Sequence, residues 1–273
     1  MLKITASEFA KIVSGQLHEI SESTILDQVP VINSKSATKN TFFVAFEGEQ
    51  VDGHNYVSEA INLGAKFALV SKPVAEPHVL VAETGRALID LAIYLRSKLP
   101  ALKIVGITGS QGKTTTKEFL NSILKLEGET VATAGNFNTD IGVPLTLLRC
   151  NEQTKFCILE MGARHSGDIA KLTKMAKPNV GVVLVVGTAH IGEFGSVEAI
   201  AKTKAELIIN LPANSTAVLG SYDAYTPKMA DSLELKKVLF GDNQNVRAAD
   251  LEMHGGYAHF DLVTPAGRNP VSL

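Results

Sequence analysis

The sequence lacks the usual features of secreted, metal-clustered and membrane proteins. It contains only two cysteines, Cys150 and Cys157, and neither has the spacing of a metal-ligand cluster. Such cysteine usage is typical of a reducing compartment, and we expect both thiols to be buried or half-buried. No apolar run approaches membrane length, and the N-terminal segment contains Lys3, Glu8 and Lys11, unlike a signal peptide. We therefore expect a cytoplasmic protein.

The chain also lacks an excess of charge of either sign. Its formal net charge is −2, so there is no general electrostatic reason to expect nucleic acid or a membrane as a partner. We expect a monomer whose substrates are bound at a local site. With 273 residues, 45% of them hydrophobic and 20% charged, the chain is long enough for two soluble domains, each with its own core.

A glycine-rich segment between a predicted strand and a predicted helix is the main feature of the sequence. Residues 103–128 read KIVGITGSQGKTTTKEFLNSILKLEG, and their apolar start predicts a buried strand. The helix that follows has Phe119, Leu120, Ile123 and Leu124 on one face. In such a phosphate cradle, loop amides and a lysine face anionic oxygens, and a threonine hydroxyl holds Mg²⁺. The segment therefore predicts a nucleoside triphosphate site.

The spacing of this loop departs from the general P-loop pattern, which requires a glycine where this chain has Ile107. The pattern here is the narrower T-G-x-x-G-K-T-T. A glycine-rich turn with a surface lysine is the alternative interpretation, but the flanking strand and helix favour a nucleotide site. The predicted ATP-binding residues are Thr108, Gly109, Ser110, Gln111, Gly112, Lys113, Thr114 and Thr115.

The patterns predict an α/β protein with two domains. Residues 1–83 form a small α/β domain with strands at 41–46 and 67–70, and Thr5 begins a short helix near the N-terminus. Residues 84–273 begin with a helix over 84–99 and end, from residue 250, in hairpin strands. Between these, strands alternate with helices as in a mostly parallel sheet. The strand candidates are residues 104–108, 130–133, 156–160, 180–186, 216–219 and 237–240.

Polar residues follow several of these strands, at the sheet edge where ligands of α/β proteins bind. Glu160 ends the strand FCILE and suits a Mg²⁺ ligand, with a capping or ion-paired glutamate as the alternative. His190 follows the strand VGVVLVV, although a lone histidine is more often structural. Asn136 and Asn138, in a loop before a helix that begins after Pro144, suit a polar ligand or a pair of Asx turns.

Several segments together resemble the Mur ligase family. They are ITGSQGKTTTKE at 107–118, GNFNTDIGVPLTLL at 135–148, LEMGARHSGDIAKL at 159–172 and AHIGEFGSVEAIAKTKAE at 189–206. In addition, residues 41–65 resemble the family's substrate-nucleotide domain. The GNFN loop and the segment from residue 189 favour the branch of the family that adds D-Ala-D-Ala.

The resemblance implies an ATP-dependent amide ligase of peptidoglycan precursor synthesis that uses ATP and Mg²⁺. ATP would phosphorylate the terminal carboxylate of UDP-MurNAc-tripeptide, and the amine of D-Ala-D-Ala would attack the resulting acyl phosphate. Lys204 corresponds to the family's carbamylated lysine, with Lys202 as the alternative, although either residue alone resembles an ordinary surface charge. The catalytic residues that the resemblance implies are Lys113, Glu160, His190 and Lys204, with Thr114 as a further metal ligand.

The resemblance also implies a muramoyl-nucleotide site. Where relatives carry Asp-Ser/Thr-Arg, this chain has Asn33, Ser34 and Lys35, and a lysine lacks the bidentate fork that arginine offers to phosphate. The segment VLGSYDAY at 218–225 stands where relatives often have Asn-Ala-Asp. The substrate-binding residues that the resemblance implies are Ser34, Lys35, Gly48, Asp52, His54, Asn136, Asn138 and Thr139, although Asp52 and His54 alone also suit an ordinary turn.

We expect the chain to be the N-terminal two-domain part of such a ligase, with residues 1–83 binding UDP-MurNAc-peptide and an ATPase domain that is incomplete at its C-terminal end. The chain alone is then expected to ligate poorly or not at all, because closure of a further domain completes the site. Two alternatives remain. One is another Mur-type ligase with a different amino acid or a folate-like acceptor, and the other is a non-catalytic module that binds nucleotide and UDP-sugar.

Overall fold

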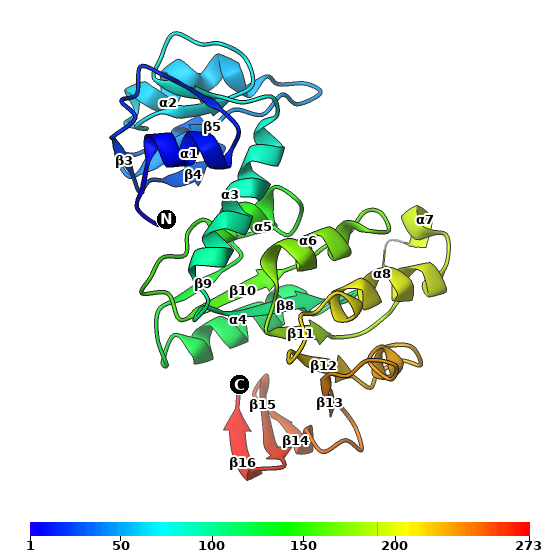
Figure 1. Cartoon of the computed structure of the whole chain (residues 1–273). Helices are drawn as coiled ribbons and strands as arrows, with labels where there is room; N and C mark the ends of the chain where they lie inside the picture. Colours follow the sequence, from blue (N-terminus) through cyan, green and yellow to red (C-terminus); the bar gives the residue numbers. More distant parts are fainter. Residues whose placement is uncertain (190) are drawn as a thin grey trace. The chain divides into compact units, whose positions relative to one another are not determined.

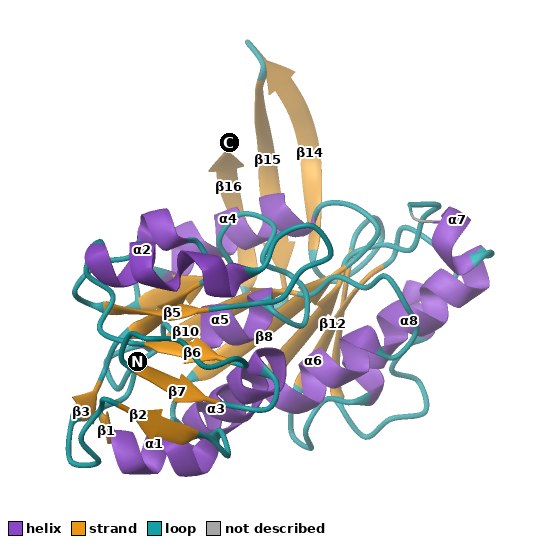
Figure 2. Ribbon diagram, turned by 90° about the horizontal axis from the view of Figure 1, so that it is seen from above, coloured by secondary structure: helices purple, strands orange, loops and turns teal. Residues whose placement is uncertain are grey.

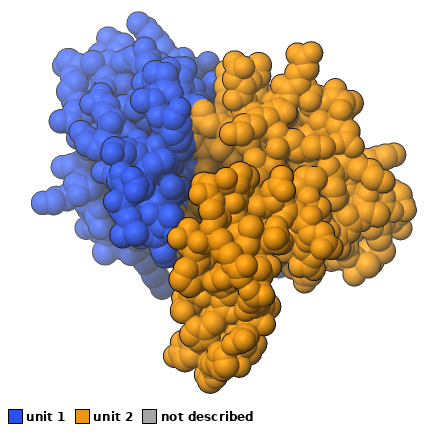
Figure 3. Space-filling model, turned by 90° about the horizontal axis from the view of Figure 1, so that it is seen from below, with its two compact units in different colours: residues 1–103, 121–159 blue, residues 104–120, 160–273 orange. Residues whose placement is uncertain are grey.

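The computed structural model describes residues 1–189 and 191–273, which form two compact units (Figure 3). Unit 1 comprises residues 1–103 and 121–159, and unit 2 comprises residues 104–120 and 160–273. The predicted fold class, α/β, is confirmed, because the described residues form four sheets together with helices, and the largest sheet is mostly parallel. The domain boundary expected at residue 83 stays a prediction. In the described part of the chain, no helix is both long and apolar enough to cross a membrane.

A five-stranded sheet with the order β2-β7-β6-β5-β4 forms the N-terminal part of unit 1, and Figure 2 shows its strands β2, β7, β6 and β5. Its neighbouring strands are parallel, except for the antiparallel pair β2–β7. The helices that accompany it are α1 (Ala6–Ile12) and α2 (Val57–Asn62). The strands are β2 (Gln16–His18), β4 (Val29–Val31), β5 (Thr41–Val44), β6 (Ala68–Val70) and β7 (His78–Leu80), beside a short antiparallel pair of β1 (Ile4–Thr5) and β3 (Ile25–Leu26).

Three fully buried phenylalanines form the centre of this core. The rings of Phe42 and Phe67 stack with their centroids 4.9 Å apart, and Phe9 meets both rings edge-on at 5.7 and 5.5 Å. Such aromatic pairs add to the stability that burial itself provides. Phe9 is positioned by α1, which begins as predicted, because Thr5 Oγ1 accepts a hydrogen bond from Glu8 N at 3.1 Å.

The remainder of unit 1 contains the predicted helix over 84–99, observed as α3 (Thr84–Lys98) with its apolar face buried. It also contains α5 (Gly142–Leu147), all of whose residues are buried. The prediction that this helix begins after Pro144 is wrong by three residues, because a proline in the first turn has no intrahelical hydrogen bond to lose. Both cysteines are fully buried, as predicted.

A six-stranded sheet has the order β13-β12-β11-β8-β10-β9, and the pairs β9–β10, β8–β11, β11–β12 and β12–β13 are parallel (Figure 1). All six predicted strands are confirmed. The strand after residue 180 ends at Val183, three residues earlier than expected, although Leu184 N still donates to Thr108 O at 3.0 Å. The strands are β8 (Lys103–Thr108), β9 (Thr130–Ala132), β10 (Phe156–Glu160), β11 (Val180–Val183), β12 (Thr216–Gly220) and β13 (Lys236–Phe240).

Helices α6 (Asp168–Ala176) and α8 (Val197–Ile209) of unit 2 pack against each other (Figure 1). Glu206 on α8 accepts hydrogen bonds from Gly167 N at 2.6 Å and Ala170 N at 3.0 Å, so it caps the start of α6. The orientation of α8 relative to α6 is thereby fixed. The predicted hairpin strands after residue 250 are confirmed as an antiparallel sheet of β14 (Arg247–His254), β15 (Tyr257–Thr264) and β16 (Gly267–Ser272).

Candidate functional site

The predicted phosphate loop connects β8 to α4 (Lys113–Leu124) in unit 2. Gly112 has a φ of +83°, and a Cβ there would lie 3.3 Å from the side chain of Leu184. A glycine is required at this position because other residues rarely adopt that conformation. Lys113 Nζ donates to Gly109 O at 2.9 Å, which holds the ammonium group against the loop. The loop thus has the shape and charge of an anion cradle.

Ser110 joins the phosphate loop to the segment that follows β11. Its N–H donates to Val185 O at 2.8 Å, and its Oγ accepts from Gly187 N at 2.8 Å. The contact arises because β8 and β11 are parallel neighbours, with Thr108 opposite Val183, so the loops after both strands lie at one edge of the sheet. Ser110, Gly109 and Lys113 therefore lie at the sheet edge where ligands of α/β proteins bind, and their contacts with ATP phosphates stay a prediction.

Two predicted metal ligands meet beside this loop. Thr114 Oγ1, in the first turn of α4, donates to Glu160 Oε2 at 3.0 Å. Glu160 is the last residue of β10 and is only 3% exposed. A hydroxyl and a carboxylate are hard oxygen donors of the kind that Mg²⁺ binds. These residues fit a magnesium ion, and Thr108 Oγ1, which is buried without a hydrogen-bond partner in the structure, is a further polar atom at the end of β8.

The predicted metal ligand His190 lies outside the described residues. Among the residues that are described, no group of three or more histidine, cysteine, aspartate or glutamate side chains could hold a metal ion. In the described residues, the oxygen donors that meet at this place are therefore the Glu160 carboxylate and the Thr114 hydroxyl group.

The structure distinguishes the two candidate lysines on α8. Lys204 is half-buried, and burial together with the nearby charge of Lys113 lowers the pKa of its ammonium group to about 8. Lys202 is exposed. Of the two, only Lys204 thus shares the electrostatic environment of the phosphate loop. Its role in metal binding stays a prediction.

The buried face of α4 is not the apolar face that the sequence presents. Lys117 is 2% exposed and forms an ion pair with Glu118 at 2.9 Å, whereas Phe119 and Ile123 are 50% and 59% exposed. Periodicity identifies the apolar stripe of a helix but not what covers it. No feature of the sequence identified Lys117 as the buried residue.

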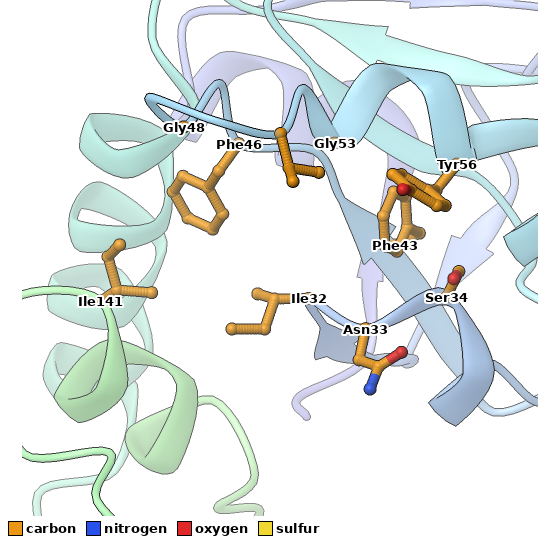
Figure 4. A pocket seen from close by; sticks show the side chains of 10 residues that line it. Ile32, Asn33, Ser34, Phe43, Phe46, Gly48, Gly53, Tyr56 and Ile141 are labelled. Atoms are coloured by element: carbon orange, nitrogen blue, oxygen red, sulfur yellow. The ribbon is translucent and has the colours of Figure 1, made fainter.

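A cavity of about 390 Å³ lies in unit 1 (Figure 4). It is lined by β5, by the segments that follow β4 and β5, and by Ile141 at the start of α5. Its walls are largely apolar and aromatic. Of the predicted substrate residues, Ser34 and Gly48 contribute to the lining, whereas Lys35, Asp52 and His54 do not. Sequence reasoning missed the aromatic lining, because TFFVAF predicted only a buried strand. The lining residues are Ile32, Asn33, Ser34, Phe43, Phe46, Gly48, Val51, Gly53, Tyr56 and Ile141.

Asp52 and His54 brace the segment that borders this cavity. Asp52 Oδ1 accepts from His54 N at 2.9 Å and lies 2.6 Å from His54 Nδ1, while Ser71 N donates to His54 Nε2 at 3.0 Å. Lys72 Nζ reaches Asp52 Oδ2 at 2.8 Å and Glu47 Oε1 at 3.0 Å. The hydrogen bond from Lys72 and those from His54 hold the pKa of Asp52 well below its usual value. Both ring nitrogens of His54 thus have partners within the protein.

The remaining predicted substrate residues lie in a short 3-10 helix, Ser34–Ser36, and in the GNFN loop before α5. Ser34 Oγ donates to Glu59 Oε2 at 2.5 Å, and Lys35 N donates to the side chain of Asn33 at 3.0 Å. In the GNFN loop, Asn138 N donates to Asn136 O at 2.8 Å, and Thr139 O accepts from Val143 N at 2.9 Å at the start of α5. These bonds fix the backbone of both segments. Contacts of these residues with substrate stay predictions.

Two family models match the chain. The model described as "Mur ligase middle domain" matches residues 107–273, and the one described as "Mur ligase family, catalytic domain" matches residues 31–93. The first alone covers more than half of the chain and includes the phosphate loop, Glu160 and α8.

Relatives named UDP-N-acetylmuramoyl-tripeptide–D-alanyl-D-alanine ligase are similar to this chain. The Escherichia coli (strain K12) protein is 33% identical over 279 residues, which cover 100% of this chain and 61% of that protein. The Mycobacterium bovis protein is 38% identical over 257 residues, covering 84% of this chain and 50% of that protein. The chain thus spans only part of the length of these relatives.

Solved structures agree with this similarity. A crystal structure of MurF from Acinetobacter baumannii superposes with a TM-score of 0.88 at 34% identity, covering 99% of this chain and 60% of that one. The MurF ligase of Thermotoga maritima, solved in complex with ADP, superposes with a TM-score of 0.77 at 32% identity, covering 90% of this chain and 58% of that one.

Proposed function

Because this chain belongs to the Mur ligase family, we propose that the protein is an ATP-dependent ligase that joins D-Ala-D-Ala to UDP-MurNAc-tripeptide. The observation that carries the proposal is the contact between Thr114 and Glu160 beside Lys113, in a loop shaped for phosphates. The acceptor and the dipeptide are taken from the names of the relatives. The synthesis of peptidoglycan precursors in the cytoplasm is the corresponding role.

The proposed chemistry activates a carboxylate by phosphorylation. A carboxylate oxygen of the tripeptide attacks the γ-phosphorus of ATP, which forms an acyl phosphate and releases ADP. The amine of D-Ala-D-Ala then attacks the acyl carbon, and phosphate leaves with the electrons of its bond to that carbon. Charge accumulates on the phosphoryl oxygens throughout, so the catalyst acts mainly through positioning and electrostatics.

The residues of the phosphate loop supply that positioning. The loop amides and the N-terminus of α4 face the phosphates, and Lys113 exchanges its hydrogen bond with Gly109 O for one to a phosphate oxygen. Mg²⁺, held by Thr114 and Glu160, would neutralise phosphate charge when bound. A second such ion would be served by His190, as the family resemblance implies.

We propose Lys204, rather than Lys202, as the carbamylated lysine. Its lowered pKa leaves a larger fraction of neutral amine near neutral pH than an exposed lysine has, and the neutral amine is the form that reacts with CO₂. The ammonium group first loses a proton, and the neutral amine then forms an N–C bond with CO₂ and releases a second proton. A cation near Lys113 is thereby converted into an anion with oxygen ligands. Relief of the repulsion between Lys204 and Lys113 favours this product.

The cavity in unit 1 is the proposed site of the substrate's nucleotide. Phe43, Phe46 and Tyr56 offer aromatic surface to a base, and Ser34 provides a hydroxyl group at the wall. Asp52 and His54 are assigned a bracing role beside this site. Asn136, Asn138 and Thr139 are proposed to face the muramoyl-peptide side.

The proposal is tested by measuring phosphate release by the protein expressed from its complete reading frame. We expect release that requires ATP, UDP-MurNAc-tripeptide and D-Ala-D-Ala together, and its loss when Lys113→Ala removes the loop's charge. An exchange of Lys103, an exposed lysine at the start of β8, for alanine is the matched control and should leave the rate unchanged.

Other outcomes would support the alternative functions. Activity with meso-diaminopimelate, lysine or glutamate in place of D-Ala-D-Ala would indicate another Mur-type ligase. ADP and UDP binding without turnover for any acceptor would indicate a binding module, and unchanged cellular function of Lys113→Ala would agree with that result.

A further inference from the structure

Asp223 lies in the turn after β12, outside the residues assigned above, and it accepts four hydrogen bonds. Its Oδ1 receives Tyr225 N and Thr226 N at 2.8 Å each, and its Oδ2 receives Thr226 Oγ1 at 2.7 Å. The fourth donor, Val186 N at 2.9 Å, belongs to the segment after β11, 37 residues earlier in the chain. Burial raises the pKa of this carboxyl, but the four donors outweigh that effect and lower the pKa below its usual value.

The segment that Asp223 holds is the same one that supports the phosphate loop. Val185 O accepts from Ser110 N, and Gly187 N donates to Ser110 Oγ, both at 2.8 Å. Successive backbone groups of an extended segment point to opposite sides. Residues 185 and 187 thus face Ser110, while the N–H of Val186 points away from it to Asp223. Ser110 and Asp223 therefore hold this short segment from its two sides.

The same turn is connected to α8, which carries Lys204. The Val186 side chain is 5% exposed and packs in a cluster with Ile200 and Ala201 of α8. Tyr225 Oη donates to Glu198 Oε1 at 2.7 Å in the first turn of that helix. Ile200 lies one helical turn before Lys204, so both contacts act on the part of α8 that precedes it. One turn is thus linked to both the phosphate loop and the helix of Lys204.

We propose that Asp223 is a positioning residue for the nucleotide site, which fixes residues 185–187 so that Ser110 is held in the form that binds phosphate. The inference rests on the proposed function only in that the loop binds a nucleotide. A carboxylate suits this role because it accepts on both oxygens and because bonds to an ionised acceptor are stronger than neutral ones. Asparagine at this position has only one acceptor oxygen. Its NH₂ group would face one pair of donors, and their hydrogen bonds to the side chain would be lost.

The first test measures amide hydrogen exchange of the whole chain without nucleotide. In Asp223→Asn we expect faster exchange at Ser110, Val186 and Gly187 than in the wild type, because their hydrogen bonds open more often. Asp231→Asn is the matched control, since the Asp231 side chain is exposed and forms an ion pair with Lys237 in the same unit. Unchanged exchange at these three amides in Asp223→Asn would overturn the proposal, whatever the chain binds.

The second test is a double-mutant cycle on the dissociation constant for ADP with Mg²⁺. We expect Asp223→Asn to weaken binding roughly tenfold and Asp231→Asn to leave it unchanged. If Asp223 acts through Ser110, the loss caused by Asp223→Asn will be much smaller in a Ser110→Ala background. If the double variant loses affinity by the product of the two single losses, the two residues act independently and the proposal is overturned. Failure of the wild type to bind ADP would instead contradict the proposed function, and the exchange result would still stand.

Tyr225→Phe serves as a second variant if Asp223→Asn unfolds. It removes one hydroxyl group and its bond to Glu198 while it keeps the carboxylate and its four donors. We expect intact exchange protection at Ser110 and a loss of ADP affinity well below the roughly tenfold expected for removal of the carboxylate. Loss of protection at Ser110 in this variant would contradict the assignment of that role to the carboxylate.

Discussion

At the scale of single residues, the site depends on close contacts between groups far apart in the sequence. Thr114 and Glu160 are separated by 46 positions and meet at 3.0 Å. A buried carboxylate that accepts from a hydroxyl group at the phosphate loop is arranged for an ion rather than for an apolar core.

Exchange of Glu160 for glutamine should weaken the binding of ADP in the presence of Mg²⁺ by at least roughly tenfold, because an amide is a poorer metal ligand than a carboxylate. Binding in the presence of a chelator should change little. Calorimetric titration of the chain with ADP, with and without Mg²⁺, measures both quantities. The control is Glu234→Gln, an exposed glutamate in unit 2. Equal losses with and without Mg²⁺ would contradict a metal-ligand role.

Lys204 should form a carbamate, because its amine has a pKa of about 8 and lies near another cation. We expect ¹³C NMR of the protein equilibrated with ¹³CO₂ to show a carbamate signal that Lys204→Arg abolishes. Lys202→Arg is the matched control on the same helix and should keep the signal. A signal that is lost in Lys202→Arg instead would assign the modification to the other lysine.

At the scale of elements, helices and loops are held by side chains of neighbouring segments. Glu206 of α8 caps α6, the turn of Asp223 connects β11 to α8, and Asp52 with Lys72 braces the segment after β5. Each brace uses a carboxylate, which accepts several hydrogen bonds at once. Such braces place binding groups more accurately than the loop backbone alone would.

Asp52→Asn should lower the melting temperature at pH 7, because it removes the ion pair with Lys72 and one acceptor for His54. The pKa of Asp52 is lowered in the folded state. Its charge therefore contributes to the free energy of unfolding above the pKa of an unfolded aspartate, which is about 4, and this contribution is lost as the pH falls below that value. The difference in melting temperature between wild type and variant should therefore shrink as the pH falls from 5 towards 2 (roughly the range in which unfolded aspartate protonates).

The measurement is thermal unfolding followed by circular dichroism across that pH range. Asp27→Asn is the control, since Asp27 is exposed and its carboxylate accepts a hydrogen bond from the side-chain amide of its neighbour Gln28. A difference that persists unchanged at acid pH would show that Asp52 acts through shape rather than charge.

At the scale of the whole molecule, the two candidate binding regions lie in separate compact units. The aromatic cavity belongs to unit 1, and the phosphate loop, Glu160 and Lys204 belong to unit 2 (Figure 3). Each unit has a buried core of its own. This separation suggests that the two ligands can be bound one at a time.

Hydrogen exchange of the chain with each ligand tests this separation. We expect ADP with Mg²⁺ to protect amides of residues 109–116 and UDP to protect amides of residues 32–56, each without the other, because a ligand stabilises only the state that binds it. Adenosine and uridine, which lack phosphates, are the matched controls for the loop and the cavity. Protection of residues 109–116 by UDP but not by ADP would contradict the assignment of the two regions.

The sequence by itself determined the order and type of most elements. Short apolar runs predicted the six strands from β8 to β13, and the Thr5 cap and the buried face of α3 were predictable because they depend on neighbours in the chain. The glycine spacing with Lys113 and Thr114 specified a phosphate loop, because its mechanism is local. Motifs and resemblance also singled out Glu160 and Lys204.

Only the tertiary structure decided which side chains meet and which are buried. Lys117 rather than Phe119 is buried on α4, Lys204 rather than Lys202 lies in the field of Lys113, and Asp52 and His54 bond to each other beside a cavity that they do not line. The role of Asp223 depends on a backbone amide 37 residues away. Burial, field strength and long-range hydrogen bonds arise from the packing of distant segments, and local patterns carry no information about that packing.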